Sequence, residues 1–300
     1  MKRVLLTGAT GFIGRHCLPS LSASGYEVHA VSSKSQQKTS DVSWHQADLL
    51  DLSQVSGLLN SVRPTHLLHL AWDVTSGKYW KSSENFRWVQ AGVHLSQEFA
   101  SCGGQRIVTA GTCAEYDWTY GYCSERLTPI LPTTVYGACK HALQVMTDAF
   151  AEQSGMSAAW GRIFFLYGPH ERPERVVSSV IRSLMRGEPA RCSHGNQIRD
   201  FLYVQDVADA FVALLSSDVS GPINFASGSP IAVKEIIQNI AEKLGRPELV
   251  QFGALPSAPN DPYVLIADAR RLREEVGWRS QYDLDQGLEL TIKWWSHQLD

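Results

Sequence analysis

Tyr136 and Lys140 stand four residues apart in the segment Tyr136-Gly137-Ala138-Cys139-Lys140, which has the pattern of a helix. Residues at this spacing lie on one face of a helix, so the phenol and the ammonium would be neighbours. A tyrosine keeps its proton up to about pH 10 unless a nearby cation stabilises the phenolate. The pair could therefore exchange a proton with a substrate near neutral pH, with Lys140 lowering the pKa of Tyr136. The alternative is an ordinary pair on a solvated helix surface.

A hydroxyl group precedes this pair at Thr112. The residues Thr109-Ala110-Gly111-Thr112 end the apolar strand that contains Ile107 and Val108. In a parallel sheet, the end of that strand lies at the carboxyl edge, where ligands bind. The Thr112 hydroxyl could then hydrogen-bond a carbonyl or hydroxyl group of a substrate.

Three glycines, Gly8, Gly11 and Gly14, follow the apolar run Val4-Leu5-Leu6 and open a helix-like stretch. A chain that leaves a buried strand here must turn sharply and bring backbone N–H groups close to a phosphate, which a Cβ would obstruct. The N-terminus of the helix adds free donors and a favourable dipole. A tight turn without a ligand is the alternative. The turn predicts a dinucleotide site formed by Thr7, Gly8, Gly11, Phe12, Ile13 and Gly14.

The segments that must position these residues alternate between strand-like and helix-like patterns, which predicts a doubly wound parallel α/β sheet. The expected strands are 3–7, 26–32, 42–46, 66–71, 105–111 and 157–165. Amphipathic helices are expected over 52–61, 80–100 and 135–153. The carboxyl ends of the strands would form the ligand crevice.

Beyond about residue 165, frequent prolines separate shorter elements, which indicates a smaller C-terminal α/β lobe. We therefore expect a dinucleotide-binding domain over 1–165 and a substrate-binding lobe over 166–300, with room for part of the chain to return to the main sheet. The aromatic end around Trp294 and Trp295 predicts a terminal helix that packs on that lobe. A helix that binds a partner is the alternative.

The composition excludes several classes of protein. A formal charge of −3 and the lack of a Lys/Arg stripe argue against nucleic acid as a partner. The six cysteines form no C-x-x-C pair and no cluster with histidine at zinc spacing, so neither a metal site nor a disulfide framework is expected. No apolar stretch approaches the length of a membrane span or a signal-peptide core. We expect a cytoplasmic protein with a small-molecule ligand.

Further landmarks follow the glycines in order: His69-Leu70-Ala71, Thr112 with Tyr116, Tyr136 with Lys140, Arg162 with Tyr167-Gly168-Pro169, and the run from Arg199 to Ala208. With this set the chain resembles the extended short-chain dehydrogenase/reductase family, which includes nucleotide-sugar epimerases, dehydratases and ketoreductases. The landmarks span residues 4 to about 228. The resemblance implies an enzyme that uses a nicotinamide dinucleotide and a nucleotide-linked sugar.

The resemblance also implies roles for single residues. Tyr136 would be the acid/base, Lys140 would hold the nicotinamide ribose, and Thr112 would orient the reacting oxygen. Arg199 looks like the family arginine that binds the diphosphate of the nucleotide-sugar, and Arg175 is a weaker candidate; an Arg199–Asp200 ion pair is the structural alternative. Further cofactor contacts would come from Asp48 and Leu49 near the adenine and from Leu70 and Ala71.

The end of the second strand bears on the choice of cofactor. Enzymes that prefer NAD usually place an Asp or Glu there to bind the ribose 2′-hydroxyl. This chain has Ser32-Ser33-Lys34 instead, which could bind a 2′-phosphate, so NADP(H) is favoured and NAD is the alternative. A solvated loop that touches no cofactor would look the same.

The residues after Thr112 bear on the reaction. Dehydratases of the family carry an Asp-Glu pair there, whereas this chain has Cys113 and Ala114. Glu115, one residue further on, could substitute for that pair, but the shift by one residue changes the direction of its side chain. The sequence therefore favours an enzyme that uses NADPH to reduce a keto group on a nucleotide-linked deoxysugar. We expect this keto group at C4 of the sugar. An NAD-dependent nucleotide-sugar epimerase is the alternative. Phe164-Phe165 and Val89 stand where many relatives place Asn, so the geometry of the substrate can differ.

Two further hypotheses concern partners. A non-catalytic protein that senses the dinucleotide would have no need of an intact Tyr136/Lys140 pair. The helices expected over 80–101 and 133–153 match the pair through which relatives form dimers, so a homodimer is expected. A face buried within the monomer is the alternative.

Overall fold

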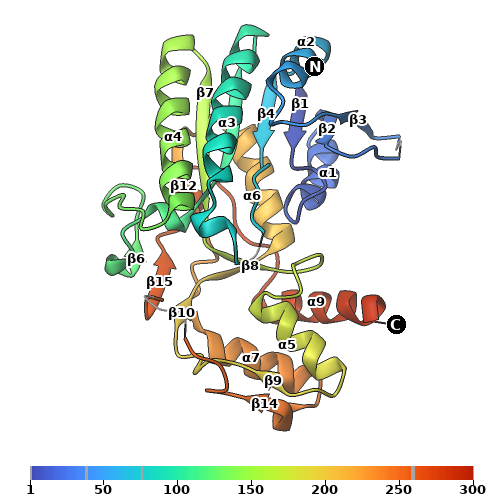
Figure 1. The fold of residues 1–300 in the computed structure, drawn as a ribbon, viewed down its shortest axis with the longest axis vertical. Helices are drawn as coiled ribbons and strands as arrows, with labels where there is room; N and C mark the ends of the chain where they lie inside the picture. Colours follow the sequence, from blue (N-terminus) through green and yellow to red (C-terminus); the bar gives the residue numbers. More distant parts are fainter. Residues whose placement is uncertain (1, 38–39, 76, 258–260, 300) are drawn as a thin grey trace.

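A computed structural model describes residues 2–37, 40–75, 77–257 and 261–299. At its centre is a seven-stranded parallel sheet with the order β12-β7-β5-β4-β1-β2-β3 (Figure 1). Its strands are β1 (Arg3–Thr7), β2 (Glu27–Ser32), β3 (Val42–Gln46), β4 (His66–His69), β5 (Arg106–Thr112), β7 (Ser157–Ile163) and β12 (Gly221–Phe225). The order reverses at β1, so the crevice beside the carboxyl end of β1 is the expected ligand site.

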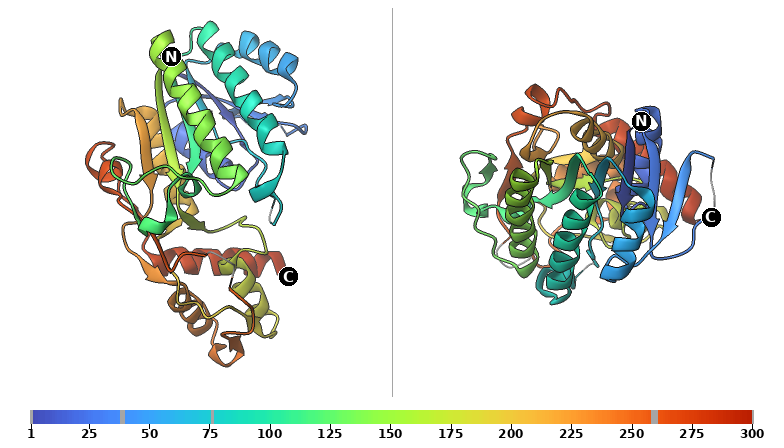
Figure 2. Two further views of the ribbon diagram at one scale, coloured as in Figure 1. Left: turned by 60° about the vertical axis from the view of Figure 1, so that its left-hand side comes forward. Right: turned by 90° about the horizontal axis from the view of Figure 1, so that it is seen from above.

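Helices cover both faces of this sheet (Figure 2). On one face, α1 (Gly14–Ala23) and α6 (Val204–Ser216) share a core that includes Leu21 and Phe211. On the other, α2 (Leu52–Val62), α3 (Glu84–Ser101) and α4 (Val135–Ser154) share a second core that includes Leu59, Phe99 and Ala151. The predicted doubly wound α/β fold is confirmed.

Local capping fixes where α4 begins and ends, and therefore where its first turn lies. The Thr134 side chain accepts a hydrogen bond from the backbone N–H of Gly137 at 3.1 Å, which satisfies one free donor of the helix start. At the other end, Gly155 takes a left-handed conformation with φ +71°. Tyr136 consequently stands in the first turn of α4, at the carboxyl edge of the sheet.

The smaller lobe packs α5 (Val176–Met185), α7 (Val233–Lys243) and α9 (Leu284–Leu299) around one core, in which Trp295 is buried. The terminal helix thus packs on this lobe, as predicted. Three small sheets accompany the main one: β13-β10-β15-β6, β11-β8 and β14-β9. Their strands are β6 (Tyr122–Cys123), β8 (Phe165–Tyr167), β9 (Ala190–Arg191), β10 (Ile198–Arg199), β11 (Phe201–Tyr203), β13 (Ile231–Ala232), β14 (Val250–Gln251) and β15 (Val264–Ala267); α8 covers Arg270–Glu274.

The expected strands agree with the observed ones to within two residues at each end. The helix expected from residue 80 instead starts at Glu84, because Tyr79–Lys81 form a separate 3₁₀ turn, η1. Strand β12 and helix α6 return to the main sheet from beyond residue 165. Strand β12 was not predicted, because it begins with Gly221-Pro222, a pair that is typical of a turn. A domain division at residue 165 stays a prediction.

The described part of the chain also bears on membranes and metals. None of its helices combines the length and apolar character that crossing a membrane requires. Over those same residues, no group of three or more His, Cys, Asp or Glu is placed to hold a metal ion. The six cysteines are all free thiols.

Glu171, in the loop that enters the smaller lobe, couples stability to pH. Its carboxylate accepts hydrogen bonds from the Ser178 N–H and hydroxyl at 3.3 and 2.7 Å. Burial raises the pKa of Glu171 from 4.5 to about 7. Because the folded carboxyl group keeps its proton longer, the free energy of unfolding falls as pH rises from about 4.5 to 7 and is then level. We expect Glu171→Gln to stabilise the protein above pH 7 by up to roughly 3 kcal/mol.

Chemical denaturation of both proteins at pH 4 and pH 8 measures this effect. Glu174→Gln, at an exposed neighbouring position, is the matched control and should change stability equally at both pH values. A Glu171→Gln effect that is the same at pH 4 and pH 8 would show that ionisation of this carboxyl group is not involved.

Candidate active site

The glycine turn between β1 and α1 is closely packed. Gly8 has φ +71°, and a Cβ on it would lie 2.8 Å from the backbone nitrogen of Ala71. A Cβ on Gly14 would overlap the carbonyl oxygen of Gly8. The Gly11 N–H closes the turn by donating to that same oxygen at 2.9 Å. Glycine is therefore required for the close approach of the first helix to the strand.

Thr7 ties the end of β1 to the end of β4. Its hydroxyl lies 2.7 Å from Nδ1 of His69 and accepts the Ala71 N–H at 3.3 Å. Burial, with a smaller contribution from the charge of Lys140, lowers the pKa of His69 to about 3, so this imidazole is neutral. Its Nε2 is buried without a hydrogen-bond partner. The structure thus brings the predicted residues Thr7, Leu70 and Ala71 to one edge of the sheet.

Tyr136 and Lys140 are both buried, on the side of α4 that faces the sheet. The Lys140 ammonium donates to the carbonyl oxygen of Ala110 at 3.0 Å and lies 3.9 Å from the centre of the Trp72 ring. Burial lowers the pKa of Lys140 to about 7, against the opposing effect of Glu115. The pKa of Lys140 falls this far because the cost of burying the ammonium outweighs the stabilising negative charge of Glu115.

The expected lowering of the Tyr136 pKa by Lys140 is wrong for this structure. Burial raises the pKa of Tyr136, and the largest opposing contribution comes from the Thr112 side chain. The reason is the orientation of Lys140, which points to Ala110 and Trp72. Tyr136 is accordingly a neutral phenol in this structure.

Thr112 ends β5 and starts the 3₁₀ turn η2 (Cys113–Glu115). Its Oγ1 accepts the Ala114 N–H at 3.2 Å, and its own N–H donates to Glu115 at 2.8 Å, so the two side chains form a reciprocal cap. Thr112 therefore stands where the sequence predicts, at the carboxyl edge and beside Tyr136.

Aromatic side chains surround the Tyr136 ring. Tyr79 and Trp80, from η1, meet it edge-on with centroids 4.8 and 5.6 Å away, and Trp72 lies at 6.4 Å. Trp118 in turn packs against Trp80 at 6.3 Å. We call Trp72, Tyr79, Trp80 and Trp118 the aromatic wall. Such side chains suit contact with the apolar face or an apolar substituent of a bound molecule.

The residues present fit a nicotinamide dinucleotide. The cradle at Gly8 and Gly14 leaves no room for a Cβ, and the buried Nε2 of His69 lacks a partner at the same edge. Helix α1 follows Ile13, whose side chain makes no capping hydrogen bond. The N–H groups of its first turn can therefore bind a phosphate.

These features agree with comparisons to known proteins. The family model described as the NAD dependent epimerase/dehydratase family matches residues 4–226. The chain belongs to that family. It is therefore an enzyme of the extended short-chain dehydrogenase/reductase type, as the resemblance implied.

Alignments with individual relatives extend over nearly the whole chain. The structure of MoeE5 in complex with UDP-glucose and NAD is 30% identical, with a TM-score of 0.86, over 99% of this chain and 100% of that one. The UDP-glucose 4-epimerase of Thermus thermophilus in complex with NAD is 26% identical, with a TM-score of 0.85, over 98% and 99%. UDP-glucuronic acid decarboxylase 1 of Danio rerio is 28% identical over 100% of this chain and 74% of its own length.

The predicted residues for the adenosine half of the cofactor also meet. The Ala47 N–H donates to the Ser32 carbonyl oxygen at 3.0 Å, which places Asp48 and Leu49 beside the end of β2. The Ser32 hydroxyl accepts the Lys34 N–H at 3.1 Å, so the Ser32-Ser33-Lys34 loop is partly closed on itself. The side chains of Ser33 and Lys34 are exposed.

Arg199 has an ion-pair partner that the sequence analysis missed. Its guanidinium lies 2.6 Å from Asp261 and donates to the Pro262 carbonyl oxygen at 2.7 Å. The Arg199–Asp200 pair considered as an alternative is wrong, since Asp200 accepts hydrogen bonds from Ser227 and Gly228 instead. Successive side chains of an extended chain point to opposite sides, which separates these two residues. A diphosphate would have to displace Asp261, and this role of Arg199 stays a prediction.

Arg175 precedes α5 and approaches the aromatic wall. Burial raises the pKa of Tyr79, and Arg175 gives the largest opposing contribution. The sequence analysis missed the aromatic wall itself. A signal was present, since two of the nine tryptophans, Trp72 and Trp80, follow the His69-Leu70-Ala71 landmark closely.

Glu115 was a candidate substitute for the missing carboxylate of a dehydratase. Its side chain is fully buried and accepts hydrogen bonds from Thr112, Trp160 and Arg162 at 2.8, 2.9 and 2.7 Å. These three donors and its complete burial hold the carboxylate inside the protein, out of reach of a bound molecule. The local geometry therefore disfavours dehydration through Glu115.

Proposed function

We propose that this enzyme is a nucleotide-sugar epimerase that oxidises and re-reduces one carbon of its substrate. The observation that carries the proposal is that Thr112 lies beside Tyr136, and that Lys140 lies near His69, which meets Thr7 at the start of the glycine turn. Its support from relatives is the UDP-glucose 4-epimerase of Thermus thermophilus in complex with NAD, 26% identical, and the complex of MoeE5, 30% identical, with UDP-glucose and NAD. A bound nicotinamide supplies the hydride acceptor and donor.

The roles of the three side chains follow from their chemistry. Thr112 holds the reacting oxygen of the sugar by a hydrogen bond, and Tyr136 takes the proton from that oxygen and later returns it. Lys140 would bind the nicotinamide ribose. To take up that proton Tyr136 must be a phenolate, which the Lys140 ammonium would stabilise only if ligand binding turned it from Ala110 and Trp72 toward the phenol.

A second candidate is reduction of a 4-keto deoxysugar with NADPH, the function that the sequence favours. It is supported by Ser32-Ser33-Lys34, which replaces the acidic residue expected for NAD, and by the aromatic wall, which suits a methyl group better than a charged substituent. Under either function we propose a nucleotide-linked sugar as substrate, with Arg199 and Arg175 as candidate phosphate contacts.

One experiment separates the two candidates. The purified protein is incubated with UDP-glucose or with a nucleotide 4-keto-6-deoxysugar, and products, NADPH absorbance and co-purified dinucleotide are followed. An epimerase converts UDP-glucose with no net change in NADPH and retains NAD. Stoichiometric loss of NADPH absorbance with the keto sugar would replace the epimerase by the reductase.

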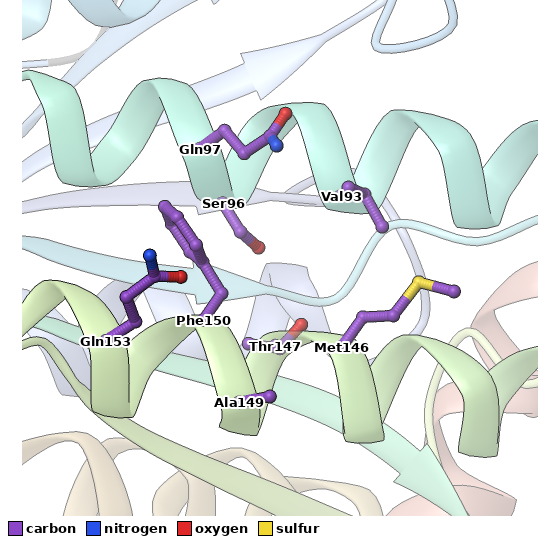
Figure 3. Close-up of a pocket in the computed structure, with 8 residues that line it drawn as sticks. All are labelled: Val93, Ser96, Gln97, Met146, Thr147, Ala149, Phe150 and Gln153. Atoms are coloured by element: carbon purple, nitrogen blue, oxygen red, sulfur yellow. The ribbon is translucent and has the colours of Figure 1, made fainter.

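We also propose that the enzyme is a homodimer formed through α3 and α4. Met146 is 50% exposed on α4 and lies at a groove between these helices (Figure 3). A second copy that presents the same face would cover it in a two-fold arrangement. The groove is lined by Val93, Ser96, Gln97, Met146, Thr147, Ala149, Phe150 and Gln153.

Met146→Glu should weaken this dimer at least tenfold, because it buries a charge without a partner at the interface. Sedimentation over a range of concentrations measures the change. Leu255→Glu, at a position 45% exposed in the smaller lobe, is the control and should sediment as the unaltered protein does. An unaltered protein that sediments as a monomer throughout would refute the dimer.

For the compartment we propose the cytoplasm, because six free thiols suit a reducing environment. Cell fractionation tests this proposal.

A further inference from the structure

A buried ion pair lies behind the proposed catalytic residues. Glu115 is 0% exposed and Arg162 is 2% exposed, and their side chains meet at 2.7 Å. The second carboxylate oxygen accepts the Thr112 N–H at 2.8 Å and the Trp160 indole N–H at 2.9 Å. Every oxygen of the Glu115 carboxylate is therefore engaged, and its charge is balanced inside the protein.

A glycine on β5, Gly111, leaves room for this pair. A Cβ on Gly111 would lie 2.8 Å from a Glu115 oxygen and would overlap the Trp160 indole nitrogen. Strand β5 thus has a glycine one residue before Thr112, where the carboxylate and the indole approach the backbone. Isolated buried ion pairs are weak stabilisers, so stability alone is a poor reason for this arrangement.

The pair touches one proposed catalytic residue directly and the helix that carries the other two. Through its hydrogen bond to the Thr112 N–H, Glu115 fixes the turn that orients the Thr112 hydroxyl. On the other side, Arg162 donates to Gln144 at 2.8 Å, one helical turn after Lys140 on α4. The network therefore joins β5, β7 and α4 at the level of the active site.

The charges that face Lys140 come from several elements. Glu115, from η2, raises the pKa of Lys140, in opposition to burial. His69, from β4, is neutral, and Tyr136, on the same helix, is a neutral phenol because its pKa is raised. Arg162, from β7, counters Glu115, and Asp148 on α4 lies near Arg162 with its pKa raised by burial. Among these groups, Glu115 is the one whose charge favours the ammonium form of Lys140, and Arg162 is paired with that same carboxylate at 2.7 Å.

We infer that Glu115 and Arg162 are positioning residues that hold Thr112 in place and set the charge state of Lys140. The inference rests on the proposed roles of Thr112, Tyr136 and Lys140. Neither residue touches the substrate. Removing the carboxylate leaves an unbalanced cation near Lys140, whereas removing the guanidinium leaves an unbalanced anion, so the two changes act on Lys140 in opposite directions.

The test compares Glu115→Gln, Arg162→Gln and the double variant. The readouts are kcat, KM and the pH above which dinucleotide binding weakens, measured by calorimetry. We expect that pH to fall by about one unit in Glu115→Gln, to rise by about one unit in Arg162→Gln, and to return near its original value in the double variant. Because Glu115 anchors Thr112, kcat should fall at least tenfold in Glu115→Gln and in the double variant, with little change in KM.

Controls separate this inference from general damage. Glu125→Gln removes another largely buried carboxylate, which accepts the Asn224 N–H at 2.8 Å, and should change neither kcat nor the binding profile. Glu115→Asp keeps the charge and should retain the pH profile with a lower kcat. If Glu115→Gln does not fold, Arg162→Gln still tests the rise of the pH above which binding weakens, and Glu115→Asp still tests the fall in kcat.

Shifts of the same sign in both single variants, or no shift in either, would overturn the inference. So would a folded Glu115→Gln protein with unchanged kcat. Failure of the proposed function is a different result: Tyr136→Phe would then retain turnover, whereas failure of this inference alone leaves Tyr136→Phe inactive.

Discussion

Tyr136→Phe should lower kcat by about a thousandfold and leave the dissociation constant of the dinucleotide within about twofold. The substitution removes the phenolic proton and keeps the ring, which packs edge-on against Tyr79 and Trp80. Binding should persist because the glycine turn and Lys140 are untouched. Steady-state kinetics and calorimetric titration of the dinucleotide measure the two effects separately.

Tyr26→Phe provides the matched control, since Tyr26 is also buried and its hydroxyl lies 3.1 Å from Ser216, within the core of the opposite face. It should retain normal turnover. If Tyr136→Phe kept normal kcat, proton transfer would have to be assigned to another group. Normal biological output from an inactive Tyr136→Phe protein would favour the dinucleotide-sensing alternative as an additional role.

The sequence predicted the parts of the site that depend on local spacing. The separation of Tyr136 and Lys140 needs only a helix, and the place of Thr112 needs only a strand that ends in a parallel sheet. The three glycines work in the same way, because the turn they form is closed by the Gly11–Gly8 hydrogen bond within the segment itself. Each of these predictions rests on contacts between residues close in the chain.

The parts that the sequence missed depend on contacts between distant residues. The partner of Arg199 is 62 residues away at Asp261, and Arg162 reaches Glu115 from 47 residues away. The orientation of Lys140 depends on the carbonyl oxygen of Ala110 and the ring of Trp72, and the raised pKa of Tyr136 depends on its burial by distant segments. No local pattern encodes these pairings, so spacing predicts the place of a candidate catalytic residue more readily than its protonation.

Gly14→Ala should weaken dinucleotide binding by about a hundredfold, the other large effect that we expect. The added methyl group would overlap the carbonyl oxygen of Gly8, so either α1 moves away from the strand or the Gly8 peptide rotates. Both changes move the N–H groups that would bind the pyrophosphate. Overpacking of this kind also destabilises a protein by about 1–3 kcal/mol. Calorimetric titration and thermal unfolding, with and without the dinucleotide, measure the two losses.

Gly57→Ala is the matched control, because Gly57 lies within α2 and a Cβ there would meet nothing within 4 Å. Alanine is a better helix former than glycine by about 1 kcal/mol, so this variant should be slightly more stable and bind the dinucleotide normally. The same substitution thus has opposite effects on stability at the two positions, since its outcome depends on the space around the glycine. If Gly14→Ala bound the dinucleotide as tightly as Gly57→Ala does, the first turn of α1 would not be the pyrophosphate site, and the cofactor would have to bind elsewhere along the carboxyl edge of the sheet.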